Sequence, residues 1–77
     1  MLNNFFTTDS FQLASYLLSE GIKLLRLDKT SPNHSVFVFQ ESERRSQLTE
    51  KFLDHEAKVE PHKYFSAQKD LKQLLYQ

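Results

Sequence analysis

The chain contains no cysteine and no tryptophan, and only one glycine and two prolines among its 77 residues. Without cysteine it forms no disulfide, and no thiolate can hold a metal ion. With a single glycine it contains no glycine-rich loop of the kind that cradles phosphate groups. The scarcity of glycine and proline also argues against a flexible linker, a repeat or a low-complexity segment. These absences favour one small domain, residues 1–77, that is held together by packing alone.

An excess of charge and a long apolar run are absent too. Ten basic and ten acidic side chains cancel, whereas a strongly basic nucleic-acid-binding protein would carry an excess of positive charge. No segment approaches the ~20 apolar residues that span a bilayer. The first residues, MLNNFFTTD, lack the basic and apolar regions of a secretory signal. We therefore expect a cytoplasmic protein that does not bind membranes.

The first part of the chain predicts a strand and a helix. Residues 4–7 are apolar and β-prone, and Thr8 or Asp9 is a suitable N-cap for a helix over residues 9–20. Gly21, the only glycine, follows at the position where a left-handed residue commonly ends a helix. The apolar stripe of this helix consists of Leu13, Ala14, Leu17 and Leu18, with Ser15 and Ser19 opposite.

Two segments, residues 22–28 and 35–40, flank the turn-forming sequence KTSPNHS and predict an antiparallel hairpin. Simple alternation in the first segment puts Leu25 and Leu27 on one face, and Leu24 and Arg26 on the other. Ser42 is a suitable cap for the next helix, residues 43–57. The apolar positions of that helix are Leu48, Phe52, Leu53 and Ala57.

The end of the chain predicts one more helix. Residues 58–60 are extended because they lead into a proline, and they are candidates for a short edge strand. Pro61 suits the first position of a helix over residues 61–76. One side of that helix carries Tyr64, Phe65, Gln68, Leu71, Leu74 and Leu75.

The predicted order of elements is β-α-β-β-α-(β)-α. This order indicates an α+β domain with a small, largely antiparallel sheet and three helices. The first six elements follow the split βαβ order of a ferredoxin-like sandwich, and the C-terminal helix is extra.

The segment HSVFVFQ, residues 34–40, raises the main question about function. As a strand it has Val36 and Val38 on one face and Phe37 and Phe39 on the other, so both faces are apolar. Two helices can cover one face of the sheet. The second face is covered by the helix 61–76, by another protein, or by stacked nucleic-acid bases.

No catalytic or metal-binding set stands out. His55 and His62 form the pattern H-E-x5-H. This spacing differs from the i,i+4 spacing of a helical zinc site, and Pro61 lies between the two histidines. The sequence has no G-x-S-x-G motif around a nucleophile. A chain of this length also has little room for a substrate pocket beside its core. We therefore expect a protein without enzymatic activity, cofactor, metal or small-molecule substrate.

The nucleic-acid hypothesis rests on the F-V-F alternation at residues 37–39. In the RNA-recognition fold the third strand carries aromatic residues that stack on bases. The consensus there is a basic residue followed by G-F/Y-G/A-F-V-x-F/Y, and this chain has H-S-V-F-V-F instead. The glycine and the leading basic residue are missing. Lys23 and Arg26 on the neighbouring strand are the candidates for phosphate contacts.

The sequence resembles a family of short prokaryotic and phage proteins that is known only as a domain of unknown function. The segments that carry the resemblance are F-F-T-T-D at residues 5–9, L-A-S-Y-L-L at 13–18, Gly21, Leu24-Leu25, F-V-F at 37–39, V-E-P at 59–61 and Y-F-S-A-Q-K-D-L at 64–71. The resemblance implies a compact α+β domain in a prokaryotic or mobile-element setting. It implies no activity, cofactor or catalytic residue.

These observations predict a small binding module that acts through protein–protein contact, with a protein partner or as a homodimer. The contact surface would be the sheet face that the last helix leaves open. Its expected centre is Phe37 and Phe39, with Phe5 or Phe6 beside them. The alternative is RNA or single-stranded DNA, bound by the same rings together with Lys23 and Arg26.

Overall fold

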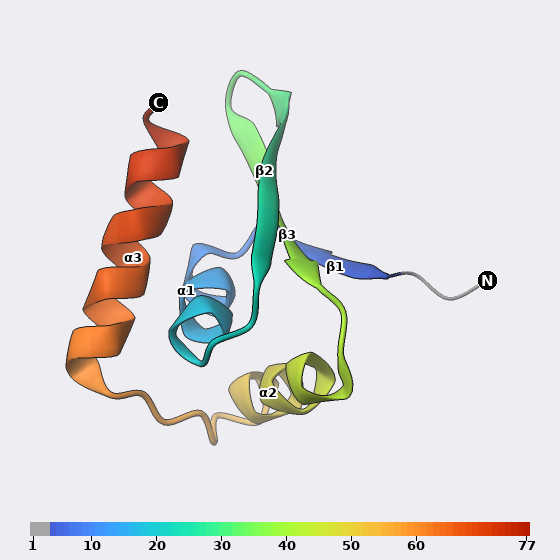
Figure 1. Cartoon of the computed structure of the whole chain (residues 1–77), viewed down its shortest axis with the longest axis vertical. Helices are drawn as coiled ribbons and strands as arrows, with labels where there is room; N and C mark the ends of the chain where they lie inside the picture. Colours follow the sequence, from blue (N-terminus) through green and yellow to red (C-terminus); the bar gives the residue numbers. More distant parts are fainter. Residues whose placement is uncertain (1–3) are drawn as a thin grey trace.

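The structure, a computed structural model, describes residues 4–77 and has three strands and three helices in an α+β arrangement (Figure 1). The elements are β1 (Phe5–Thr8), α1 (Phe11–Ser19), β2 (Leu24–Ser31), β3 (His34–Gln40), α2 (Glu43–Leu53) and α3 (Pro61–Leu75). The predicted fold class, the hairpin and all three helices are confirmed. No helix in the described part of the chain is long and apolar enough to cross a membrane.

The sheet is antiparallel, with strand order β1-β3-β2. On one side of β3, Phe39 is paired with Phe6, and on the other side it is paired with Leu24. The pairing of β2 with β3 shifts between Leu24 and Arg26, which places Leu25 in an irregularity of the ladder. A bulge of this kind changes which face the following side chains occupy.

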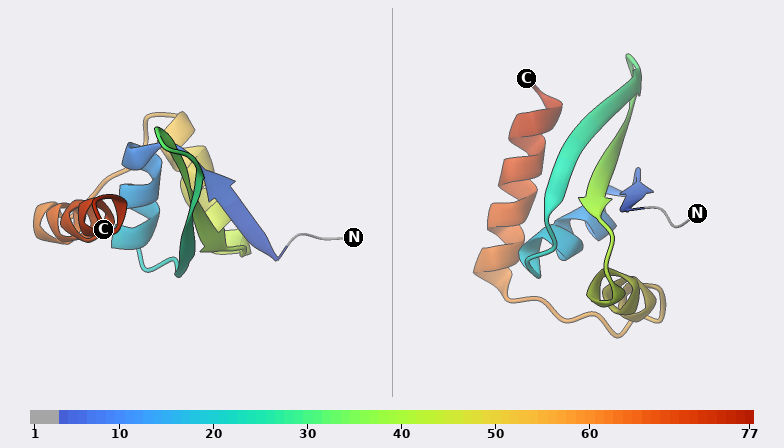
Figure 2. Two further views of the ribbon diagram at one scale, coloured as in Figure 1. Left: turned by 90° about the horizontal axis from the view of Figure 1, so that it is seen from above. Right: turned by 45° about the vertical axis from the view of Figure 1, so that its right-hand side comes forward.

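The helices α1 and α3 lie on one side of the sheet, and α2 lies beyond the end of β3 (Figure 1). Seen from above, α3, α1 and the sheet follow one another, with α1 in the middle (Figure 2, left). Five consecutive residues of α1, Leu13–Leu17, are buried because the helix has neighbours on several sides. Ser15 was expected on the polar side of α1, but it is fully buried and donates a hydrogen bond to the Phe11 carbonyl at 2.7 Å.

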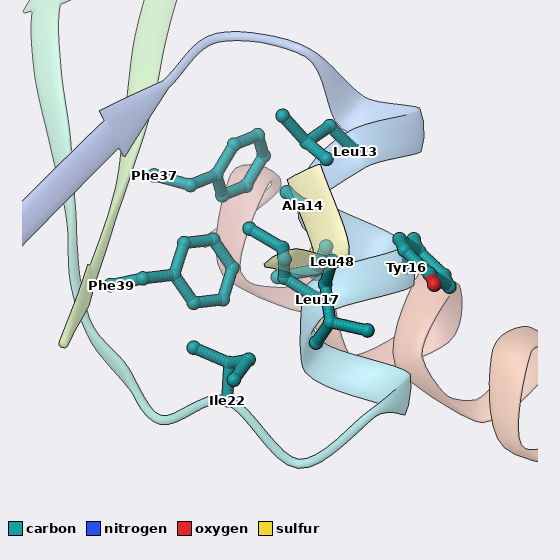
Figure 3. Close-up of a cluster of buried hydrophobic side chains, with 9 residues drawn as sticks. Leu13, Ala14, Tyr16, Leu17, Ile22, Phe37, Phe39 and Leu48 are labelled. Atoms are coloured by element: carbon teal, nitrogen blue, oxygen red, sulfur yellow. The ribbon is translucent and has the colours of Figure 1, made fainter. Parts of the chain in front are cut away.

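The core lies between α1 and the inner face of the sheet. Phe37 and Phe39 point from β3 toward α1 (Figure 3). The other members of the buried cluster are Leu13, Ala14, Tyr16, Leu17, Ile22, Leu48 and Leu71. Since each buried ring removes a large apolar area from water, the two phenylalanines contribute a large share of the stability of this small domain.

Local signals explain where α1 begins and ends. Ser10, rather than the expected Thr8 or Asp9, is the N-cap, and its side chain accepts a hydrogen bond from the Leu13 N–H. Gly21 has a φ of 90°, which is the left-handed conformation expected for it. The N–H of Ile22 donates to the Leu17 carbonyl at 3.0 Å, so the helix ends in a Schellman motif.

The helix α2 is capped by Ser42, as predicted, and is anchored by two arginines at its start. Arg44 donates to the Glu20 carbonyl at the end of α1. The guanidinium of Arg45 lies 3.9 Å from the centre of the Phe6 ring and donates two hydrogen bonds to the Glu41 carboxylate. These contacts hold α2 against the inner side of the sheet.

Several expectations about the second half of the chain are wrong. The helix α2 ends at Leu53 instead of residue 57, because His55 takes a left-handed conformation with φ 60°. Residues 58–60 form no strand. Leu53 and Phe65, which were expected on apolar faces, are 67% and 64% exposed.

Most important for function, α3 does not cover the second face of the sheet. It packs against α1, on the side away from the strands (Figure 2, left). Ala67 and Leu71 are its buried residues. The face of the sheet that points away from α1 is therefore left without a helix.

Candidate functional site

The two rings that were expected at the centre of the contact surface are inside the protein. Phe37 is 2% exposed and Phe39 is 0% exposed, and both pack against α1 (Figure 3). The placement of a binding surface on these rings is therefore wrong. The physical reason is that alternation along β3 defines two faces but does not say which of them the helices cover.

The open face of the sheet carries the other set of side chains. Val36 and Val38 alternate with the buried rings of β3, and neither belongs to the core cluster. Phe5 and Thr7 of β1 occupy this face as well, because Phe6 between them packs into the core. We call this surface, formed by Phe5, Thr7, Leu25, Arg26, Asp28, Val36, Val38 and Gln40, the outer face.

A contact between the two outer strands crosses this face. The guanidinium of Arg26 on β2 lies 5.7 Å from the centre of the Phe5 ring on β1. Because β3 lies between these strands, the two side chains meet over β3. Val38, paired with Thr7 on one side and Arg26 on the other, is 0% exposed. The contact between Arg26 and Phe5 thus helps to shield from water a valine that lies outside the cluster of Phe37 and Phe39.

The most exposed apolar side chains of the outer face are Phe5 and Leu25. Phe5 is 42% exposed and Leu25, in the irregular part of β2, is 39% exposed. They lie beside charged groups of both signs, since Arg26 donates to Asp28 with an Nε–Oδ1 distance of 3.0 Å. The outer face is therefore a partly apolar surface whose central positive charge is neutralised within the chain.

The remaining predicted site residue, Lys23, is exposed and directly precedes β2. Its carbonyl accepts a hydrogen bond from the Gln40 N–H at 2.9 Å, so it lies at the end of the sheet where Phe5 pairs with Gln40. The structure thus brings Lys23, Arg26 and Phe5 to the same sheet and separates them from Phe37 and Phe39, which point to the core.

A second feature is a hollow beside the C-terminal ends of α1 and α2. It is lined by Tyr16, Glu20, Leu48, Lys51, His55, Glu56 and Lys58. Burial raises the pKa of the Tyr16 phenol, and the neighbouring Glu20 carboxylate raises that pKa further against an opposing effect of Arg44. Within residues 4–77, no group of three or more His, Cys, Asp or Glu side chains is placed to hold a metal ion.

The histidines make local contacts. His34 Nε2 lies 3.2 Å from the Asp9 carboxylate, and its Nδ1 lies 2.8 Å from the Thr30 hydroxyl. His62 Nδ1 lies 3.1 Å from the Glu60 carboxylate, which also caps α3. Each of these pairs connects neighbouring segments of the surface.

Sequence reasoning missed two features of this region. Arg45 lies in the charged segment that begins α2, yet its side chain is only 11% exposed and stacks on Phe6. Arg26 was assigned to the same face as Leu24, but the irregularity at Leu25 moves it to the outer face. Glu41 lies four residues before Arg45, and Thr49 lies four residues after it. This i,i+4 spacing was a usable signal for the first feature. The sequence contained no comparable signal for the second.

A family model with the description "Domain of unknown function (DUF5659)" matches residues 3–77. No curated protein matches the chain, and no solved structure matches it.

Proposed function

Because this chain belongs to DUF5659, a family of domains of unknown function, we propose its role from its own surface: it is a non-enzymatic module that binds another protein through the outer face of its sheet. The observation that carries this proposal is the position of α3. In a domain this small, a third helix would normally help to bury the sheet, yet α3 packs on α1 and leaves the outer face open.

The composition of the outer face supports protein contact. Partly exposed apolar side chains, Phe5 and Leu25, lie beside an internally neutralised pair, Arg26 and Asp28. Protein interfaces commonly combine an apolar or aromatic centre, arginine and a polar rim. A contiguous apolar surface with such a rim is a frequent sign of a binding site on a soluble protein.

The test compares variants of two exposed aromatic residues. Phe5→Ser removes the ring from the outer face, whereas Phe65→Ser removes an even more exposed ring from α3, far from that face. A partner isolated with the wild-type chain is purified, and its affinity is measured by calorimetry with each variant after circular dichroism has confirmed folding.

We expect Phe5→Ser to weaken binding by about tenfold or more, as is typical for a central aromatic residue of an interface. Phe65→Ser is expected to bind as the wild type does. If both variants bind like the wild type, the outer face is not the binding surface and the proposal is wrong.

Binding of RNA or single-stranded DNA is the second candidate. With Phe37 and Phe39 buried, the only aromatic ring left for base stacking on the outer face is Phe5. The observation that still favours this candidate is the contact of Arg26 with Phe5, together with the position of Lys23 directly before β2, at the end of the sheet where Phe5 pairs with Gln40. Against it stands Asp28, whose carboxylate pairs with Arg26.

Fluorescence anisotropy with labelled single-stranded RNA and DNA separates the two candidates. Phosphate contacts release counterions, so nucleic-acid binding through these side chains would weaken steeply as salt rises. We expect no salt-dependent binding. Binding that rises at low salt and is lost in both Phe5→Ser and Lys23→Ala would favour nucleic acid over protein as the ligand.

The cellular setting is part of the proposal. We infer a cytoplasmic protein of prokaryotic or mobile-element origin from the absence of cysteine and from the resemblance described above. Fractionation of cells that express the chain at its natural level would test the location. Recovery in a membrane or secreted fraction would contradict it.

A further inference from the structure

We propose that the partner is a second copy of this chain, and that the two copies join the free edges of their β1 strands into one continuous antiparallel sheet. This inference rests on the proposed function, because β1 carries Phe5 of the outer face and its free edge is where the second copy binds. It follows from the hydrogen-bonding groups of β1, from the difference between the two edges of the sheet, and from the register that two identical β1 strands can adopt.

Two residues of β1 point their backbone N–H and C=O groups away from the rest of the sheet. The N–H of Glu41 donates to the Asn4 carbonyl at 3.1 Å, in line with the register that pairs Phe6 with Phe39. In an antiparallel pair, residues that hydrogen-bond to the neighbour alternate with residues whose N–H and C=O point away. Asn4, Phe6 and Thr8 therefore face β3. Phe5 and Thr7 present their N–H and C=O groups at the free edge.

The two edge strands of the sheet, β2 and β1, differ in how they are protected from pairing with another chain. The edge strand β2 has two register irregularities and carries Arg26, Asp28 and Lys29. Charged side chains and bulges are the usual means by which proteins prevent an edge strand from pairing with another chain. The edge strand β1, with the sequence FFTT, has no charge, no proline and no irregularity in its register. Only the β2 edge is protected in this way.

In the described part of the chain, no further strand lies beside β1 at its free edge. In the split βαβ order the last strand pairs with the first strand of the chain. Residues 58–60, which would supply that strand, form none, and the chain passes directly into α3. The place beside β1 is thus not filled by any strand of the described chain. A strand from a second copy has the right geometry to fill it.

Two identical β1 strands can pair in a register that uses all of their outward-facing backbone groups. Two β1 strands that meet around a two-fold axis at Phe6 place Phe5 of one copy opposite Thr7 of the other. Each of these pairs exchanges two backbone hydrogen bonds, and all the outward-facing groups of Phe5 and Thr7 are used. The two Phe6 residues then face each other as the closely spaced, non-hydrogen-bonded pair, where aromatic side chains interact favourably.

Charge does not oppose this arrangement. The chain as a whole is neutral, and β1 contains no charged residue. Arg45 lies over Phe6 and is already paired with Glu41 at 2.7 Å, and Arg26, which lies over Phe5, is paired with Asp28 at 3.0 Å. Two copies can therefore approach along β1 without the repulsion that would separate like-charged edges.

The first experiment measures molecular mass against concentration by analytical ultracentrifugation. We expect the mass of the wild-type chain to rise from 9.1 kDa toward twice that value. Thr7→Pro removes an outward N–H and leaves the hydrogen bonds to β3 intact, since proline is tolerated on the solvent side of an edge strand. Thr7→Lys adds an edge charge and serves as a second variant if the proline disturbs folding. Both variants are expected to stay monomeric.

The second experiment tests the register by cross-linking, which is clean because the natural chain has no cysteine. Under mild oxidation, a mixture of Phe5→Cys and Thr7→Cys chains is expected to form mainly the mixed disulfide, because only unlike positions face each other at hydrogen-bonded pairs. Lys29→Cys on the protected β2 edge is the control and is expected to stay reduced. Predominant disulfides between identical chains would place the axis elsewhere and contradict this register.

The outcomes separate this inference from the proposed function. A strict monomer at every concentration, or a dimer that Thr7→Pro leaves unchanged and that gives no mixed disulfide, overturns the β1 pairing. A different protein that still binds with a loss in Phe5→Ser would then leave the outer face as the binding surface. Loss of dimer in Thr7→Pro together with the mixed disulfide supports the β1 pairing.

Discussion

Two residues of this chain, Gly21 and His55, end helices in the same left-handed conformation. Gly21 follows α1 with φ 90°, and His55 follows α2 with φ 60°. In each case the next residue donates a hydrogen bond to a carbonyl five positions back, Ile22 to Leu17 and Glu56 to Lys51. Glycine adopts this conformation freely, whereas a residue with a Cβ does so at a cost.

Replacing Gly21 with alanine isolates this conformational cost. No atom lies within 4 Å of the position that a Cβ would occupy, so steric contact contributes nothing. We expect Gly21→Ala to lower the free energy of unfolding by about 1–2 kcal/mol, measured by urea unfolding followed by circular dichroism. Gly21→Asn, which tolerates the left-handed region better, should lose less. Equal losses for both variants would show that another effect dominates.

The opposite substitution, His55→Gly at the end of α2, is expected to stabilise the fold. His55→Gly relieves a left-handed strain of about 1–2 kcal/mol, and part of that gain is offset by the larger freedom of glycine in the unfolded chain. The net expectation is an increase of about 0.5–1 kcal/mol in the free energy of unfolding. Urea unfolding of His55→Gly and His55→Ala in parallel checks this, because His55→Ala keeps the strain. A gain in His55→Ala as large as in His55→Gly would refute it.

At the scale of elements, local signals made most of the fold predictable. The cap Ser42, Pro61 at the start of α3 and Gly21 after α1 act within a few residues of the sequence. Such signals set where helices begin and end, and the turn between β2 and β3 set the hairpin. The end of α2 was missed because His55, unlike glycine, gives no sequence signal for a left-handed residue.

What could not be predicted depends on contacts between distant elements. Phe37 and Phe39 point inward because α1 lies on their side of the sheet, and no pattern within β3 contains that information. Ser15 is buried because α1 has α3 on one side and the sheet on the other. The contact between Arg26 and Phe5 joins two strands that are not neighbours in the sheet. The site was therefore less predictable than the elements that carry it.

The position of α3 leads to a prediction about helix packing. Leu71 is fully buried between α3 and the core, whereas Phe65 on the same helix is 64% exposed. Leu71→Ala leaves a cavity and is expected to lower the free energy of unfolding by about 2–5 kcal/mol. Phe65→Ala is the control and is expected to change it by less than about 0.5 kcal/mol. If urea unfolding gives similar losses for both, α3 does not dock through Leu71.

For the whole molecule, the titratable groups with shifted pKa values set the pH range of stability. Two hydrogen bonds from Arg45 hold the pKa of Glu41 below its ordinary value of 4.5. The Lys63 N–H and then His62 lower the pKa of Glu60 in the same direction. Carboxylates with depressed pKa values stabilise the fold above the unfolded pKa, and that stability is lost as pH falls through the folded pKa.

The variant Glu41→Gln tests whether Glu41 causes the loss of stability at acid pH. Glu41→Gln removes the titrating group and weakens the contact with Arg45, so it is expected to lower stability at neutral pH and to flatten the loss below pH 4.5. Unfolding midpoints in urea, measured from neutral to acidic pH, check both effects. Glu43→Gln, at the exposed first residue of α2, is the matched control and should keep the acid loss. An unchanged acid limb in Glu41→Gln would show that other carboxylates govern it.

The alkaline side depends on Tyr16, whose phenol stays protonated above its ordinary pKa of 10.0 because burial disfavours the phenolate. A raised folded pKa means that this contribution is complete below pH 10 and is lost as pH rises through the folded value. Tyr16→Phe keeps the ring stacked on Phe52, with centroids 6.1 Å apart in the wild type, and should flatten the alkaline loss. Tyr76→Phe, at a residue 83% exposed, is the control and should retain it. Parallel alkaline limbs in both variants would place the titrating group elsewhere in the molecule.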